Sequence, residues 1–179
     1  MKNIRRFDDN EKTKDSIYLR INSAVCRHKA LPEIIRGMSL VTTAAIYIFF
    51  LFMLLYITDF GRSIGFDLLK TLAVCASDFL LVTLIRKLID RKRPYTVYGY
   101  EPVIPRKRNA GSMPSRHVFS VFMIAFAAYQ MGVLWFAALI AAGVLTAVLR
   151  VVGGVHYVSD VVAAFLIAAA FGVPAFIVF

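Results

Sequence analysis

Predominantly apolar runs are the feature of this sequence that most limits its fold. Five of them cover residues 38–58, 64–85, 118–131, 133–149 and 157–179. A helix of about 20 residues crosses the ~30 Å hydrocarbon core of a bilayer, and its backbone hydrogen bonds are all satisfied internally. The runs therefore predict an all-α, multi-pass transmembrane helix bundle of about five spans. The third and fourth runs are short, so their polar flanking residues are expected at the membrane interface.

The composition agrees with a membrane protein. Hydrophobic residues make up 59% of the 179 positions, and the mean hydropathy is +0.69. The net charge is +10, and the Lys and Arg residues gather in segments 1–36 and 86–108, beside the apolar runs. Basic blocks in such places favour anionic lipid headgroups over nucleic acid as the partner. The two cysteines, Cys26 and Cys75, indicate no disulfide framework.

The chain divides into a basic N-terminal segment, 1–37, and a transmembrane domain, 38–179. Residues 15–36 alternate apolar and basic side chains, which predicts an amphipathic helix lying in the membrane interface and broken near Pro32. The segment is charged throughout and lacks the apolar centre of a signal peptide, so we expect it to be retained.

Some polar residues fall inside the second run. Ionisable groups at that depth are expensive and are often functional. Here we interpret them as contacts between helices or near the membrane surface, and not as catalytic groups. They are Asp67, Lys70, Ser77 and Asp78.

Three short polar segments stand at the ends of the apolar runs. They cover residues 86–94, 113–117 and 150–160. If the spans alternate in direction, all three segments face the same side of the membrane. We therefore expect them to converge on one site.

The last of these segments carries the pattern of an activated nucleophile. His156 and Asp160 are four residues apart and so share one helix face. A carboxylate on one ring nitrogen fixes the tautomer and leaves the other nitrogen able to attack. Gly153 and Gly154 permit a tight turn that brings Arg150 back toward His156.

The other segments supply groups suited to a phosphate. Pro114 and Ser115 look like the first turn of a helix, whose N–H groups and positive dipole end attract anions. His117, in that turn, is a candidate proton donor to a leaving oxygen. Arginine binds phosphate through paired, charge-assisted hydrogen bonds. The candidate cations are Arg86 or Lys87, Arg93, Arg116 and Arg150.

The motifs resemble those of the type 2 phosphatidic acid phosphatases. The family pattern is Lys, six residues, Arg-Pro; then Pro-Ser-Gly-His; then Ser-Arg, five residues, His, three residues, Asp. This chain has Arg93-Pro94, Pro114-Ser115-x-His117, and Arg150 with His156 and Asp160 in the same order and spacing. The family also includes bacterial undecaprenyl-pyrophosphate and phosphatidylglycerophosphate phosphatases and the vanadium haloperoxidases.

The resemblance implies a lipid phosphatase that works through a phosphohistidine. His156 would be the nucleophile, Asp160 its support and His117 the proton donor. The phosphate would lie against Arg93, Ser115 and Arg150, and no cofactor or metal is implied. The substrate would be a membrane lipid bearing a phosphomonoester or pyrophosphate.

Three positions depart from the family pattern. Arg86 stands where the family has Lys, with Lys87 one place later, and the register favours Arg86. Arg116 replaces the Gly, and Leu149 replaces the Ser before Arg150. The changes affect the details of the phosphate site and the choice of lipid, but not the type of reaction.

Two other interpretations stay open at this point. His117, His156 and Asp160 are also the residue types of a two-His, one-carboxylate metal site, although nearby arginines repel a cation. A lipid-binding protein or transporter would likewise use arginines to hold an anionic headgroup. Such a protein needs no nucleophile backed by a carboxylate, so the His156 and Asp160 pattern favours an enzyme, either a phosphatase or a phosphotransferase.

The basic residues also predict an orientation in the cell membrane. Five spans place the N-terminal segment and all three motifs on one face, with little positive charge opposite beyond Arg62. Lys and Arg near span ends favour the cytoplasmic side. We therefore expect a cytoplasmic active site, although members of the similar family often work on the outer face. The sequence leaves the lipid and the oligomeric state open.

Overall fold

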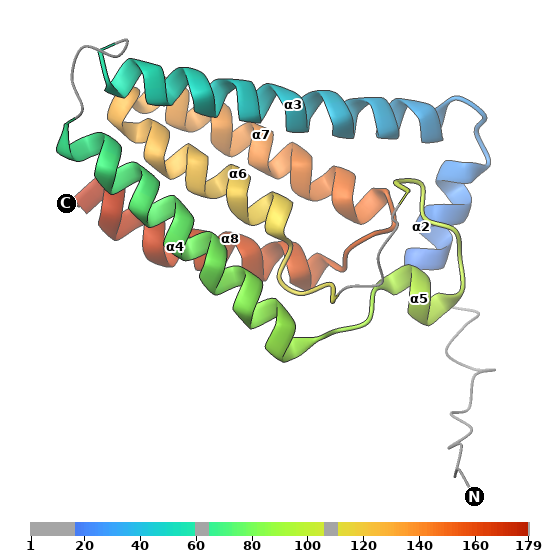
Figure 1. The fold of residues 1–179 in the computed structure, drawn as a ribbon. Coiled ribbons are helices and arrows are strands. Elements are labelled where there is room, and N and C mark those ends of the chain that lie inside the picture. The colour runs from blue at the N-terminus through green and yellow to red at the C-terminus, as the bar shows by residue number, and fades with distance from the viewer. Residues whose placement is uncertain (1–16, 60–64, 106–110, 179) are drawn as a thin grey trace, which may run out of the picture.

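The computed structural model describes residues 17–59, 65–105 and 111–178. All regular elements in these ranges are helices (Figure 1), which confirms the all-α prediction. The basic residues before position 17, together with Arg62, lie outside the described residues.

The helices follow one another with short connections. In chain order they are α2 (Ile17–Cys26), α3 (Leu31–Ile57), α4 (Phe66–Ile89), α5 (Pro94–Tyr98), α6 (Arg116–Ala127), the 3-10 helix η1 (Ala128–Met131), α7 (Val133–Val152), α8 (Val158–Val173) and the π-helix η2 (Pro174–Val178).

Among the described residues, four segments are long and apolar enough to cross a membrane. They are Leu31–Ile57, Phe66–Tyr98, Val133–Val152 and Val158–Val178. The third predicted span, 118–131, corresponds to α6 and η1, and α6 alone has 12 residues, or about 18 Å of helix. The prediction of about five spans roughly agrees with this bundle, in which the third predicted span is a short internal helix.

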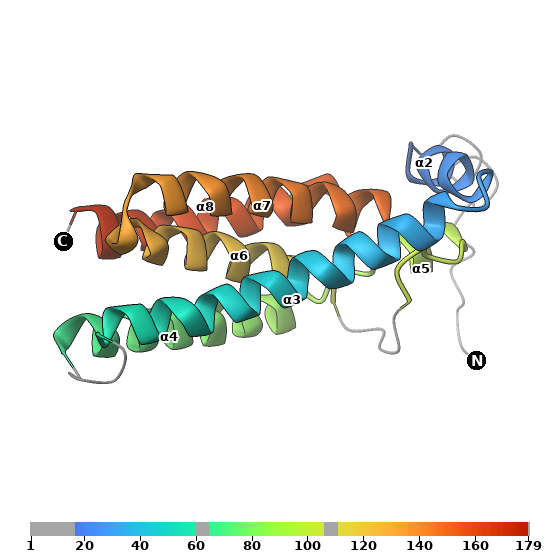
Figure 2. The same cartoon turned by 90° about the horizontal axis from the view of Figure 1, so that it is seen from above.

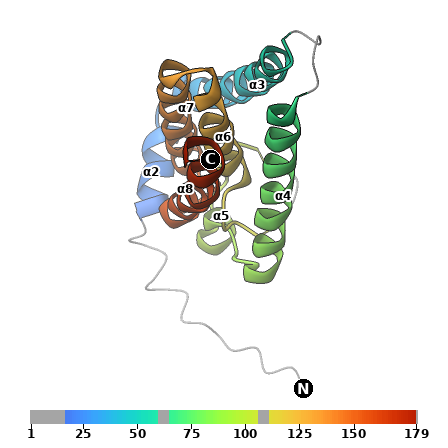
Figure 3. The same cartoon turned by 90° about the vertical axis from the view of Figure 1, so that its left-hand side faces the viewer.

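Helix α6 lies at the centre of the bundle and packs against α3, α4, α7 and α8. Figure 3, which looks along the bundle, shows α4 on one side of it and α7 and α8 on the other. Val118 and Phe119 are almost fully buried. A Cβ atom added to Gly172 of α8 would lie 2.6 Å from the ring of Phe126 on α6. Glycine at this position therefore allows the two helices to approach closely.

The lipid-facing helices show the opposite pattern. Large apolar side chains on α3 and α4 are exposed, among them Leu40 at 72% and Leu80 at 68%. In a soluble protein such a surface would be unfavourable, but a bilayer covers it with hydrocarbon.

The predicted N-terminal interfacial helix is shorter than expected. It corresponds to α2, which ends at Cys26, and α3 begins at Leu31. The predicted break near Pro32 is present at residues 27–30. Pro32 itself lies in the first turn of α3, where a proline is tolerated because its missing N–H has no helical partner. Residues 31–37, which we assigned to the N-terminal segment, are therefore continuous with the first span.

The helices alternate in direction, as the sequence predicted. Figure 2 shows α2 and α5 at one end of the bundle and the C-terminus at the other. The end of α4, the start of α6, the end of α7 and the start of α8 all reach the end that carries α2 and α5 (Figure 1). This arrangement brings the three polar segments together.

Candidate active site

Hydrogen bonds join the three predicted motif segments. Arg86 Nη1 donates to the carbonyl of Pro114 (3.2 Å), and Arg93 Nη1 donates to the carbonyl of Val155 (2.9 Å). The amide of Ser115 donates to the carbonyl of Asp160 (3.1 Å). The convergence expected from the order of the spans is thus present in the structure.

His156 and Asp160 form a buried pair at the start of α8. His156 Nδ1 lies 3.3 Å from Asp160 Oδ2, and the two residues are 1% and 0% exposed. The amide of Tyr157 also donates to Asp160 Oδ2 (3.0 Å). An ionised carboxylate only accepts hydrogen bonds, so it places the ring hydrogen on Nδ1. The lone pair of the ring is then on Nε2.

The surroundings of His156 favour its neutral form. Burial lowers the pKa of His156 to about 4, and the charges of Arg93 and Arg86 act in the same direction. The hydrogen bond and the charge of Asp160 oppose this shift. His156 is therefore neutral at neutral pH, and the neutral form is the one in which an imidazole can attack.

The turn between α7 and α8 places His156 in this position. Gly154 has φ +76°, a conformation that glycine adopts without strain. The amides of Val155 and His156 both donate to the carbonyl of Arg150 (3.2 and 3.3 Å). The turn therefore brings the backbone of Arg150 next to His156, as the glycine pair predicted.

Arg86 and Arg93 are buried beside the pair, at 7% and 4% exposed. Lys87, the alternative to Arg86, is exposed on the outside of α4. A helix turns by about 100° per residue, so adjacent residues cannot both face the site. The structure thus places Arg86, and not Lys87, among the motif residues.

Ser115, His117 and Arg150 occupy the start of α6 and the end of α7. The Ser115 hydroxyl is buried and has no hydrogen-bond partner within the described part of the chain. His117 is half-buried and lines a small pocket that Thr43 of α3 also lines. Arg150 Nη2 donates to Thr43 Oγ1 (3.4 Å). Thr43, which the sequence did not mark, therefore lies next to both residues.

Arg116 is directed toward α4. Its guanidinium carbon lies 5.9 Å from the centroid of the Phe79 ring, within the range of a cation–π contact. This contact places Arg116 next to α4.

Arg91 is a site residue that the sequence did not reveal. It belongs to the basic segment 86–92, which on its own reads as a solvated collar, yet its Nη1 donates to Asp160 Oδ1 (3.1 Å). The left-handed conformation of Asp90, with φ 37°, ends α4. The chain then turns toward α8, and no periodic pattern in the sequence predicts that turn.

The alternative metal site finds no support in the arrangement of the residues. Within residues 17–59, 65–105 and 111–178, no group of three or more His, Cys, Asp or Glu residues is placed to hold a metal ion. His117, His156 and Asp160 do not form such a group, so a two-His, one-carboxylate triad is not formed here.

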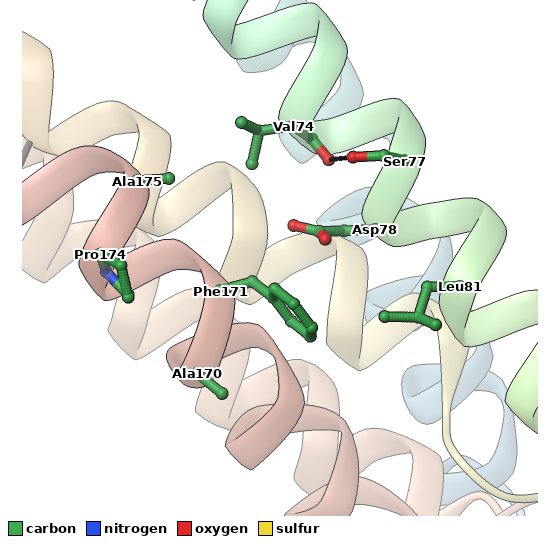
Figure 4. Close-up of a pocket in the computed structure, with 8 residues that line it drawn as sticks. All are labelled: Val74, Ser77, Asp78, Leu81, Ala170, Phe171, Pro174 and Ala175. Atoms are coloured by element: carbon green, nitrogen blue, oxygen red, sulfur yellow. Dashed lines mark hydrogen bonds between the residues drawn. The ribbon is translucent and has the colours of Figure 1, made fainter.

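A second polar feature lies deeper in the bundle. Figure 4 shows Asp78 of α4 directed into a groove of about 570 Å³ between α4 and the C-terminal end of α8, near Phe171 and Pro174. The Ser77 hydroxyl, in contrast, donates to the carbonyl of Val74 in its own helix (3.1 Å). Since α8 runs from His156 toward this groove, the groove is separate from the site.

Comparison with known proteins gives a family match and several solved structures with a similar fold. Residues 67–179, more than half of the chain, match the model of the PAP2 superfamily. No curated protein sequence matches the chain significantly.

Two of these solved structures cover most of this chain. One is a transmembrane PAP2 type phosphatidylglycerolphosphate phosphatase from Bacillus subtilis, with 20% identity, a TM-score of 0.68, and coverage of 88% of this chain and 81% of that one. The other is LpxE from Aquifex aeolicus, with 19% identity, a TM-score of 0.68, and coverage of 91% and 96%.

The family match covers all three motifs, and the structural matches extend over most of the bundle. The chain therefore belongs to the PAP2 superfamily, as its motifs predicted, and is a membrane enzyme of the lipid phosphatase type.

Proposed function

We propose that this protein hydrolyses the phosphomonoester or pyrophosphate of a membrane lipid through a phosphohistidine on His156. The observation that carries the proposal is the buried His156–Asp160 pair beside two buried arginines, Arg86 and Arg93. A carboxylate-oriented neutral imidazole next to fixed positive charge suits attack on a phosphoryl group.

The phosphoryl oxygens interact with the cations and with the start of α6. Arg86, Arg93 and Arg150 neutralise their charge, and the Ser115 hydroxyl donates a hydrogen bond to one of them. The N-terminal N–H groups of α6 add a positive dipole end. Because each arginine is held by a hydrogen bond to the protein, the charges are preorganised for the transition state.

The reaction proceeds in two displacements. Nε2 of His156 attacks phosphorus, the bond from phosphorus to the lipid oxygen breaks, and His117 donates its proton to that oxygen. Water then attacks the phosphohistidine while His117 accepts a proton from it. Inorganic phosphate leaves, and both histidines return to their starting protonation states.

A groove beside His117 suits the lipid chain. It measures about 390 Å³ and is lined by apolar side chains of α3, α4 and α6. Tyr47, Ser120 and Ile124 line both this groove and the small pocket that contains His117. A lipid whose chain lies in the groove therefore has its polar end near the proposed proton donor.

Phosphate release from a panel of lipids tests the proposal. The panel contains phosphatidate, phosphatidylglycerol phosphate, a polyprenyl pyrophosphate and a phosphorylated glycolipid, and His156→Ala is the control enzyme. We expect release from at least one lipid, undiminished in excess chelator and absent from the control. Phosphate moving to a second acceptor would identify a phosphotransferase, and headgroup binding without any release would contradict an enzyme.

We also propose that the site faces the cytoplasm. The support is the basic charge of the N-terminal segment, which lies outside the three motifs in the sequence. Single cysteines near Asp9 and Thr96, in a background lacking Cys26 and Cys75, are probed with an impermeant thiol reagent on intact cells. We expect no labelling of either; labelling of both would reverse the orientation, and labelling of only one would contradict the number of spans.

A further inference from the structure

Arg91 makes three contacts with the first turn of α8. Its Nη1 donates to Ser159 Oγ (2.7 Å) and to Asp160 Oδ1 (3.1 Å). Its guanidinium carbon lies 3.9 Å from the centroid of the Tyr157 ring. A single side chain, at a position that the family pattern leaves unspecified, is thus fixed against three of the four residues that follow His156.

The two oxygens of Asp160 have separate partners. Oδ1 accepts from Arg91, whereas Oδ2 lies against His156 Nδ1 and accepts from the Tyr157 amide. A carboxylate bound on both oxygens cannot rotate about its Cβ–Cγ bond. The contact of Arg91 therefore fixes the plane of Asp160, and Asp160 in turn fixes the tautomer and the ring of His156.

We propose that Arg91 is a positioning residue, which holds Asp160 in place and offsets part of its negative charge, so that His156 stays neutral and correctly oriented. This proposal rests on the proposed function of His156. Arg91 acts through Asp160, whereas Arg86, Arg93 and Arg150 act on the phosphate.

The charges around the pair set the direction of the electrostatic effect. Arg86 and Arg93 lower the pKa of His156, and Asp160 raises it. Tyr157 is a further titratable neighbour, packed against Tyr18 of α2. Burial raises the pKa of Tyr157 to about 12, so it is uncharged at neutral pH.

Tyr98 of α5 stacks on Tyr18 and completes this aromatic layer. Removing the charge of Arg91 leaves the negative charge of Asp160 less compensated. Asp160 then stabilises a protonated His156 more strongly, and the pKa of His156 rises.

The test is the kinetics of Arg91→Gln on a lipid that the wild-type enzyme hydrolyses. We expect kcat to fall by roughly 10–100-fold, as it does when a group that orients an active-site side chain is lost, with KM nearly unchanged. The acid limb of kcat/KM should move up by roughly one pH unit. Arg91→Lys, which keeps the charge and the donors, should recover part of kcat and keep the wild-type acid limb.

A double-variant cycle asks whether Arg91 acts through Asp160. On an Asp160→Asn background, Arg91→Gln should have little further effect, because the two residues form one unit. Lys92→Gln, an exposed neighbour of the same charge, is the matched control and should behave as wild type. If Arg91→Gln lowers kcat by the same factor in the wild-type and Asp160→Asn backgrounds, the proposal is contradicted.

Two other outcomes would overturn it. A higher KM and weaker inhibition by inorganic phosphate, with kcat unchanged, would mean that Arg91 contacts the phosphate. Wild-type kinetics and an unmoved acid limb would mean that its contacts are only structural. If Arg91→Gln does not fold in detergent, Arg91→Lys takes its place in the double-variant cycle. Its kcat and acid limb, with and without Asp160→Asn, then test the proposal.

The His156→Ala variant separates this proposal from the proposed function. If His156→Ala keeps its turnover, the phosphohistidine mechanism fails regardless of Arg91. If His156→Ala is inactive and Arg91→Gln behaves as wild type, only the role of Arg91 fails.

Discussion

Arg86 Nη1 donates a hydrogen bond to the carbonyl of Pro114 at 3.2 Å, which joins the end of α4 to the residue before the N-cap of α6. This contact crosses from one motif segment to the next. It holds a buried positive charge beside the first N–H groups of α6, where an anion is bound most favourably.

The contact predicts different effects for two neighbouring cations. Arg86→Ala should lower kcat/KM by roughly 10²-fold or more, as expected for a lost transition-state donor. Lys87→Ala, its exposed neighbour, should change kcat/KM by about twofold or less, because an exposed charge interacts weakly. Steady-state kinetics of both variants on one lipid check this. A larger loss at Lys87 would show that the loop is shifted by one residue.

His117 is predicted to act in both displacements. His117→Ala should slow formation or breakdown of the phosphoenzyme by roughly 10²-fold, the usual effect of removing a general acid or base. Single-turnover kinetics measure the two steps separately. The burst of released lipid reports formation of the phosphoenzyme, and the release of phosphate reports its breakdown. Unchanged rates of both steps would exclude His117 from proton transfer.

The lowered pKa of His156 predicts an unusual pH profile. An ordinary histidine becomes protonated below pH 6.5, whereas His156, with a pKa of about 4, stays neutral well below that value. The nucleophile should therefore remain active between pH 7 and 5, with its acid limb in kcat/KM near pH 4. Profiles recorded for wild type and His117→Ala separate the two histidines. An acid limb near 6.5 that persists in His117→Ala would contradict the assignment.

The same shift links stability to pH. Between pH 6.5 and about 4, the unfolded chain binds a proton at His156 that the folded protein excludes. This residue therefore makes the folded state less stable as the pH falls through that window.

Close packing of α6 against α8 predicts a local requirement for glycine. Gly172→Ala should destabilise the protein by about 1–3 kcal/mol. The new Cβ would lie 2.6 Å from Cγ and 2.7 Å from Cβ of Phe126, and these atoms are too near the backbone to move aside easily. Gly37→Ala is the control, since a Cβ there meets nothing within 4 Å. This substitution removes a glycine from the interior of a helix, which should stabilise the protein by up to ~1 kcal/mol. Unfolding in detergent compares them, and equal stability of the two variants would contradict the packing.

The sequence predicted the features that depend on local spacing. The interval from His156 to Asp160 places both on one helix face, and the glycine pair predicts the turn that returns to Arg150. The alternation of apolar runs then predicts which span ends meet. Each of these inferences needs only helix geometry and chain direction.

The remaining features depend on tertiary packing. Arg91 looks like any solvated cation until the turn at Asp90 brings it to α8, and Thr43 is one of many polar residues in a span. The start of α3 at Leu31 was missed because a proline in the first turn of a helix does not break it. The central, internal position of α6 depends on the helices around it and not on its own apolar sequence.

The most direct test of the account is to find where the phosphate resides during a single turnover. A lipid with radiolabelled phosphate is mixed with excess enzyme, the reaction is quenched in alkali, where phosphohistidine persists, and the labelled peptide is sequenced. We predict label on His156 in the wild type and none in His156→Gln, with a larger labelled fraction if breakdown is slowed in His117→Ala. Phosphate release at the wild-type rate without label on His156, or label on His156→Gln, would contradict the phosphohistidine mechanism.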